Sequence, residues 1–140
     1  MKDVAESLRV GKAVRAKSKG CYRNAIRAIE KLPEYQDADY VEGFAVLPSP
    51  VLFPFEHGWL EKGGKVIDPT MAEQDLKYFA GLRWRGLPGL ADAKSLPRPR
   101  GTPELPFFFR LGMGGCNSPE FRQARVEAYR FAGILLPPGV

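Results

Sequence analysis

The sequence predicts an α+β domain in which an antiparallel sheet of about four to five strands carries a helix packed across it. Residues 40–47 are apolar on both faces apart from Glu42, which is typical of a central strand. Residues 55–70 carry a hairpin signature, two apolar runs joined by a Lys-Gly-Gly turn. Residues 19–32 repeat apolar side chains at helical spacing, so this helix has a face with which to cover the sheet.

The whole chain, 1–140, is expected to form a single domain because its length can bury a sizeable core. We expect the core at 18–81, a proline- and glycine-rich connector or flap at 86–106, and a C-terminal strand and helix at 107–133. No apolar run approaches a membrane span, and the polar first residues lack the apolar segment of a signal peptide. These features predict a cytoplasmic protein without membrane contact, whose two cysteines are free thiols.

Two helices are expected before the first strand. Residues 3–17 form the first, with a loose apolar stripe. The second, 19–32, has Ser18 as its expected N-cap and ends at Pro33. Cys21 then lies in its first turn, facing the core, where the positive end of the helix dipole favours a thiolate.

The hairpin holds His57, which is the only histidine of the chain. With the glycines at 63–64 as central turn residues, Lys62 pairs with Lys65. His57 and Asp68 then lie on one face as diagonal neighbours, close enough for the carboxylate to fix the imidazole tautomer. A shift of one residue would move Asp68 to the other face, so this expectation depends on the register.

The second half of the chain is less regular. Residues 72–79 are predicted as a short helix and 82–85 as one more strand. The five prolines and three glycines of 86–106 predict a connector or an active-site flap. A short apolar strand is predicted at 107–111 and a last helix at 119–131, with the first and last helices around the edge of the sheet.

The net charge of +5 is unevenly distributed, since residues 1–32 carry a net charge of +6 and residues 33–81 a net charge of −6. A basic flank of this kind can meet nucleic acid or an acidic protein. It can also be the solvated side of helices. The basic residues are not interleaved with aromatic residues as in a single-strand-binding groove, so nucleic acid is not the favoured partner.

Cys21, His57 and Asp68 provide, in chain order, a nucleophile, a base and an orienting acid. A thiolate attacks a carbonyl carbon, an imidazole holds it as an ion pair and later protonates the leaving group, and a third group fixes the ring. The backbone N–H of Cys21 supplies one oxyanion donor. Tyr22 and Trp59 are candidates for the walls of a substrate cleft. Each triad residue also has a structural explanation, such as a small buried thiol or an Asx-turn before proline.

Four segments together resemble the transglutaminase-like branch of the papain-like cysteine peptidase superfamily. They are Cys21-Tyr22-Arg23-Asn24-Ala25, Tyr40-Val41-Glu42-Gly43, His57-Gly58-Trp59-Leu60 and Val66-Ile67-Asp68-Pro69-Thr70. The same segments are similar to small bacterial and phage proteins. The resemblance covers 18–81 and implies a helix opened by the cysteine, packed on an antiparallel sheet, with the histidine and aspartate on successive strands. It leaves peptide hydrolysis, deamidation, acyl transfer or no catalysis open.

The chain departs from the family in one respect, because the family's glutamine several residues before the cysteine, a second oxyanion donor, is missing from residues 14–20. Asn24 or a backbone amide would take that role. Glu42, in mid-strand, would either touch the site or satisfy buried backbone. Cys116 is a rival nucleophile, but no second histidine accompanies it. The candidate ligands lack paired metal-ligand spacing, so no metal is expected.

We therefore expect a cysteine-dependent hydrolase or acyltransferase acting on an amide or related acyl bond of a protein, a peptide or another substrate. Cys21 would be the nucleophile, His57 the general base and acid, and Asp68 the orienting group, with no cofactor. The alternative is a non-catalytic binding protein of the same fold. It would contact nucleic acid or an acidic protein through its basic N-terminal region.

Overall fold

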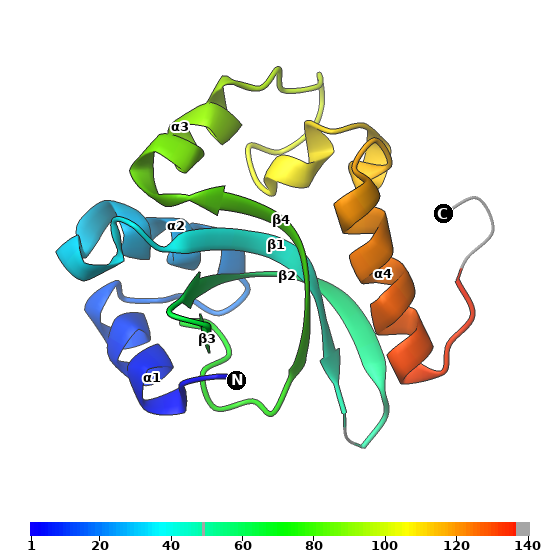
Figure 1. The fold of residues 1–140 in the computed structure, drawn as a ribbon, viewed down its shortest axis with the longest axis horizontal. Helices are drawn as coiled ribbons and strands as arrows, with labels where there is room; N and C mark the ends of the chain where they lie inside the picture. Colours follow the sequence, from blue (N-terminus) through cyan, green and yellow to red (C-terminus); the bar gives the residue numbers. More distant parts are fainter. Residues whose placement is uncertain (49, 137–140) are drawn as a thin grey trace.

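The structure, a computed structural model, describes residues 1–48 and 50–136 and has an α+β fold (Figure 1). Its helices and strands are α1 (Val4–Ala13), α2 (Cys21–Lys31), β1 (Asp39–Leu47), β2 (Phe53–Lys62), β3 (Lys65–Ile67), β4 (Lys77–Arg85), α3 (Gly86–Ser95) and α4 (Pro119–Ala132). Three short 3-10 helices accompany them: η1 (Pro33–Tyr35), η2 (Phe107–Phe109) and η3 (Met113–Gly115).

The strands form one antiparallel four-stranded sheet in the order β3-β2-β1-β4. The central position predicted for 40–47 is confirmed, since β1 pairs with β2 on one side and β4 on the other. The predicted hairpin register is also confirmed, because Lys62 pairs with Lys65 around two glycines of positive φ. Strand β3 pairs only as far back as Leu60, so the earlier part of β2 is an edge of the sheet.

Helices α2 and α4 cover two ends of the same face of the sheet (Figure 1). Tyr40 of β1 belongs to the apolar cluster of α2, and Phe44 of the same strand belongs to that of α4. Residues four apart on a strand share a face, so both helices lie on one side. The expectation that the last helix lies at the edge is therefore wrong. Small residues, Ala124 and Ala128, let α4 pack closely against the sheet.

The opposite face is closed by the curvature of the sheet. Small residues of β1, Gly43 and Ala45, lie between the strands that carry Trp59 and Tyr78. The rings of Trp59 and Tyr78 meet over them, with centroids 5.0 Å apart. A β-bulge between β1 and β4, next to Gly43, increases the local twist that brings the flanking strands together. The candidate base and acid, His57 and Asp68, are buried on this face.

Four local predictions are wrong. The helix predicted at 72–79 is absent, because Lys77–Arg85 forms the continuous strand β4, which pairs along β1 and so overrides local periodicity. Half of the predicted connector at 86–106 is helix α3. The strand predicted at 107–111 is instead the 3-10 helix η2. Gly20, not Ser18, is the N-cap of α2, and it makes no side-chain cap bond.

Glu42 explains why residues 107–109 are not a strand. Its fully buried carboxylate accepts hydrogen bonds from the backbone N–H groups of Phe107 at 2.7 Å and Phe108 at 2.8 Å, and from the Tyr40 hydroxyl at 2.6 Å. Of the two roles predicted for Glu42, the structure shows the satisfaction of buried backbone. Burial raises the pKa of Glu42 to about 7, although these hydrogen bonds oppose the rise.

The raised pKa of Glu42 makes stability depend on pH. Folding favours the protonated carboxyl, so this contribution is fully present below the ordinary value of 4.5 and is lost as the pH rises towards about 7. Glu42→Gln should therefore flatten the pH profile of the unfolding free energy, removing a fall of up to about 3 kcal/mol between pH 4.5 and about pH 7. Chemical denaturation across that range measures it. The exposed Glu127→Gln is the control, and a profile unchanged in Glu42→Gln would contradict the expectation.

Candidate active site

Cys21 is the first residue of α2 and is half-buried beside a surface cleft. Its approach to the sheet depends on Gly58 of β2, since a Cβ there would lie 2.6 Å from the ring of the next residue, Tyr22. The expectation that the thiol faces the core is wrong, because Cys21 lines the cleft. The loop before it places Arg15 and Lys19 at positive φ, 54° and 64°, which is uncommon for residues with a side chain.

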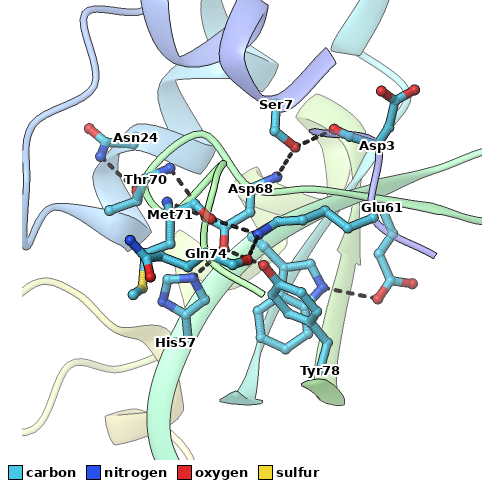
Figure 2. Close-up of polar contacts among 12 residues, drawn as sticks. Asp3, Ser7, Asn24, His57, Glu61, Asp68, Thr70, Met71, Gln74 and Tyr78 are labelled. Carbon is cyan, nitrogen blue, oxygen red and sulfur yellow. Dashed lines mark hydrogen bonds and ion pairs between the residues drawn. The ribbon is translucent and has the colours of Figure 1, made fainter. Parts of the chain in front are cut away.

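His57 is 2 % exposed and lies on β2, where β3 no longer pairs. Its Nε2 lies 2.8 Å from Oδ2 of Asp68, so the predicted meeting of these side chains is present (Figure 2). Because Nε2 is engaged by Asp68, the ring nitrogen left for Cys21 is Nδ1. The ring also stacks against Trp59, with centroids 5.9 Å apart, and this packing holds its orientation.

Asp68 follows β3 directly and is completely buried. Its Oδ2 accepts a hydrogen bond from the Tyr78 hydroxyl at 2.6 Å in addition to His57. Its Oδ1 accepts from the backbone N–H groups of Thr70 at 3.2 Å and Met71 at 3.0 Å, the geometry of an Asx-turn (Figure 2). The same carboxylate thus closes a turn and holds the imidazole. Burial raises its pKa, but these hydrogen bonds and the charge of His57 outweigh burial and lower it.

The pKa of His57 is raised to about 9. Burial alone would lower it, but hydrogen bonds to Asp68 and Cys21 and the charges of both side chains have the larger combined effect. The imidazolium is therefore the dominant form at neutral pH. A cation next to Cys21 is the arrangement that stabilises a thiolate in cysteine-dependent enzymes.

Of the other predicted site residues, only Tyr22 lines the cleft. Trp59 lies behind the His57 ring and donates its indole N–H to Glu61 at 3.0 Å. The Asn24 amide is used within the protein: it donates to the Lys17 carbonyl and to Oγ1 of Thr70, both at 2.8 Å, and accepts from the Lys17 N–H at 3.1 Å. Asn24 therefore ties the loop before Cys21 to the loop after Asp68.

Three residues of the site were missed by sequence reasoning. The sequence predicts a helix at Tyr78, whereas in the structure Tyr78 binds Asp68 from β4. Ser7 accepts the Asp68 backbone N–H at 2.9 Å from helix α1, 61 residues earlier. Lys2 reaches the loop after Asp68. A short sequence motif gives no signal for Ser7 or Lys2, while alternation around Tyr78 was the available signal for a strand.

The cleft has a volume of about 1000 Å³. Its lining combines apolar side chains with charged ones and is drawn from α1, the loop before α2, the start of α2, β2 and residues 69–74. Besides Cys21 and His57 it includes Leu8, Lys12, Lys19, Phe55, Glu56, Met71 and Glu73. A cleft of this size can hold a small organic or peptide-sized ligand next to Cys21.

The rival nucleophile Cys116 is exposed and does not line this cleft. Several basic residues of the first two helices have partners within the protein: Arg9 pairs with Glu6, Arg23 with Glu104, and Arg27 donates to a backbone carbonyl. Lys12 and Lys19 remain at the cleft.

Two further findings concern residues 1–48 and 50–136. Within them, no group of three or more His, Cys, Asp and Glu side chains is arranged to hold a metal ion. None of the helices in the same residues combines the length and apolar character needed to cross a bilayer.

Comparisons with protein-family models, with curated proteins and with solved structures found no match to this chain. Function is therefore argued from the geometry. That geometry consists of a half-buried thiol at a helix start, a buried imidazole held by a buried carboxylate, and a cleft beside them.

Proposed function

We propose that this protein is a cysteine-dependent hydrolase or acyltransferase of the transglutaminase-like, papain-like kind, acting on an amide or related acyl bond. One observation carries the proposal: the only histidine is buried with Nε2 on Asp68 and lines the same cleft as Cys21. A buried ion pair contributes little net stability after its desolvation cost, so its presence in a cleft favours a functional role.

In the first half of the reaction, the Cys21 thiolate attacks the carbonyl carbon of the substrate, and the carbonyl π electrons move to oxygen. When the tetrahedral intermediate collapses, the bond to the leaving group breaks and that group takes the proton of the His57 imidazolium. The product is a thioester on Cys21 and a neutral imidazole. Asp68 holds the ring so that Nδ1 faces the sulfur throughout.

In the second half, neutral His57 takes a proton from water or from an amine as that nucleophile attacks the thioester. Collapse expels the Cys21 thiolate and restores the imidazolium, giving a carboxylic acid with water or a new amide with an amine. The backbone N–H of Cys21, at the start of α2, is one oxyanion donor. Because the Asn24 amide is used elsewhere, a second backbone N–H is the better candidate for the other donor.

The proposal is tested by comparing the two cysteines. Cys21 should react with iodoacetamide at least about tenfold faster than Cys116 near pH 7, because only Cys21 has an imidazolium beside it. His57→Ala should reduce Cys21 to the rate of Cys116, and Cys116→Ser should leave the Cys21 rate unchanged. Peptide mapping by mass spectrometry measures both sites in one sample.

Acyl chemistry is tested with p-nitrophenyl acetate, which should transfer its acetyl group to Cys21 and release nitrophenolate. Intact-mass measurement of the wild-type protein and of Cys21→Ala shows whether the adduct is at this residue. Equal, slow alkylation of both cysteines, or an acetyl adduct that persists in Cys21→Ala, would overturn the proposal.

A further inference from the structure

The first seven residues hold the segment that carries Asp68. The backbone N–H of Asp3 donates to the Val66 carbonyl at 2.9 Å, and the Val66 N–H donates to the Met1 carbonyl at 3.0 Å. Ser7 accepts the Asp68 N–H at 2.9 Å and donates its hydroxyl proton to the Asp3 carbonyl at 2.6 Å (Figure 2). The segment thus extends the sheet at β3 and fixes the backbone where the strand ends.

In addition to this backbone pairing, the side chain of Lys2 contacts the loop after Asp68 and the ring of Tyr78. Its Nζ donates hydrogen bonds to the carbonyl oxygens of Met71 and Gln74, each at 2.6 Å. It also lies 5.4 Å from the centre of the Tyr78 ring, whose hydroxyl binds Asp68. Burial lowers the pKa of Lys2, while the charges of Asp68 and Asp75 oppose this. One partly buried ammonium therefore contacts the loop and the tyrosine that both support the orienting carboxylate.

The loop held by Lys2 is also one wall of the cleft, since residues 69–74 all line it. This loop contains no helix or strand. Its own hydrogen bonds are few: the Gln74 N–H donates to the Met71 carbonyl at 3.2 Å, and the Asx-turn joins Thr70 and Met71 to Asp68. Loops with few internal contacts open easily unless other elements fasten them.

We propose that Lys2 is a positioning residue of the active site, an inference that rests on the function proposed above. Its ammonium fastens residues 69–74, which keeps the Asp68 carboxylate against His57 and sets the position of the cleft wall. Lys2 does not act on the substrate. It acts through Asp68, and loss of its contacts would let the carboxylate drift from Nε2 of His57, which even at about 1 Å is costly for a catalytic group.

The test compares Lys2→Met with Lys2→Arg and with Lys65→Met. Lys65 is a matched control because it lies on β3 beside the same segment, its side chain is exposed, and its ammonium pairs with Asp3 at 3.7 Å. The rate of Cys21 alkylation across pH and the hydrogen exchange of residues 68–76 are measured in each. Lys2→Met should slow alkylation about tenfold near pH 7 and speed exchange of the loop. Lys2→Arg, whose fork can reach both carbonyls, should restore most of the rate, and Lys65→Met should leave it unchanged.

Alkylation of Cys21 and hydrogen exchange of the loop together distinguish failure of the Lys2 positioning role from failure of the proposed function. Faster exchange with an unchanged alkylation profile in Lys2→Met would show a purely structural fastening and overturn the positioning role. Equal losses in Lys2→Met and Lys2→Arg would also overturn it, because a second cation could not replace the first. If Cys21 of the unmodified protein reacts no faster than Cys116, the proposed function itself fails, and the positioning role fails with it.

Discussion

Asp68→Asn is expected to lower the pKa of His57 from about 9 to below its ordinary value of 6.5 and to slow alkylation of Cys21 by tenfold or more near neutral pH. Burial already lowers this pKa, and the carboxylate is the main group that reverses the effect of burial. An amide carries no charge, so burial would dominate in the variant. The imidazolium that the proposed mechanism requires beside Cys21 would then be the minor form.

The tautomer of His57 changes in the same variant. The amide that Asp68→Asn introduces would donate a hydrogen to Nε2 of His57, so the ring proton would reside on Nδ1, the nitrogen left for Cys21. That nitrogen could no longer accept the thiol proton. The variant should fold, because the amide oxygen can still accept the N–H groups of Thr70 and Met71, and the Tyr78 hydroxyl can accept where it formerly donated.

A single histidine makes the measurement direct, because imidazole resonances in an NMR titration belong to His57 alone. Asp92→Asn, an exposed change on α3, is the matched control and should leave the titration as it is. If the pKa of His57 is unchanged in Asp68→Asn, a group other than Asp68 raises it. The triad assignment would then have to be abandoned.

The geometry of the predicted site followed from local signals. Two adjacent glycines predicted the turn, the turn fixed the register, and the alternation of side chains placed His57 and Asp68 on one face. The apolar stripe and Pro33 likewise predicted α2 within two residues at each end. These features are readable because each depends on residues adjacent in the chain.

The supporting contacts were not predictable in this way. Ser7 accepts a hydrogen bond from Asp68, 61 positions away, and Glu42 accepts one from Phe107, 65 positions away. In neither pair does a local sequence pattern identify the partner. The mixed periodicity of the segment around Tyr78 predicts a helix there. Its segment forms strand β4 because it pairs with the second edge of β1. Pairing between distant segments, not local propensity, decides this structure.

The central strand links fold and site through small residues. Gly43 pairs with His57 on β2 and with Ala80 on β4, so it lies beneath the place where side chains from both flanking strands converge. A larger residue there would separate them. In the sequence, Gly43 indicates only a locally weaker strand. The structure shows that the missing side chain lets β4 and the Trp59 indole approach the β1 backbone closely.

Gly43→Ala is expected to lower the free energy of unfolding by about 4 kcal/mol or more. The added Cβ would lie 2.2 Å from the Phe79 carbonyl oxygen, 2.9 Å from the Gly81 nitrogen and 3.0 Å from the Trp59 ring. Two of these neighbours are backbone atoms of β4, so relief requires β4 to move away from β1. Urea denaturation followed by tryptophan fluorescence measures the loss.

Gly101→Ala separates this steric effect from the general cost of replacing glycine. Gly101 has φ 82°, but an added Cβ meets nothing within 4 Å, so only the backbone cost of about 1–2 kcal/mol should appear. In any Gly43→Ala protein that remains folded, Tyr78 should move with β4, and alkylation of Cys21 should slow because Asp68 loses the tyrosine hydroxyl. If Gly43→Ala lowers the free energy of unfolding no more than Gly101→Ala does, β4 can move away from β1 without a measurable loss of stability. The close contact of β1 and β4 would then not be what holds Tyr78 against Asp68.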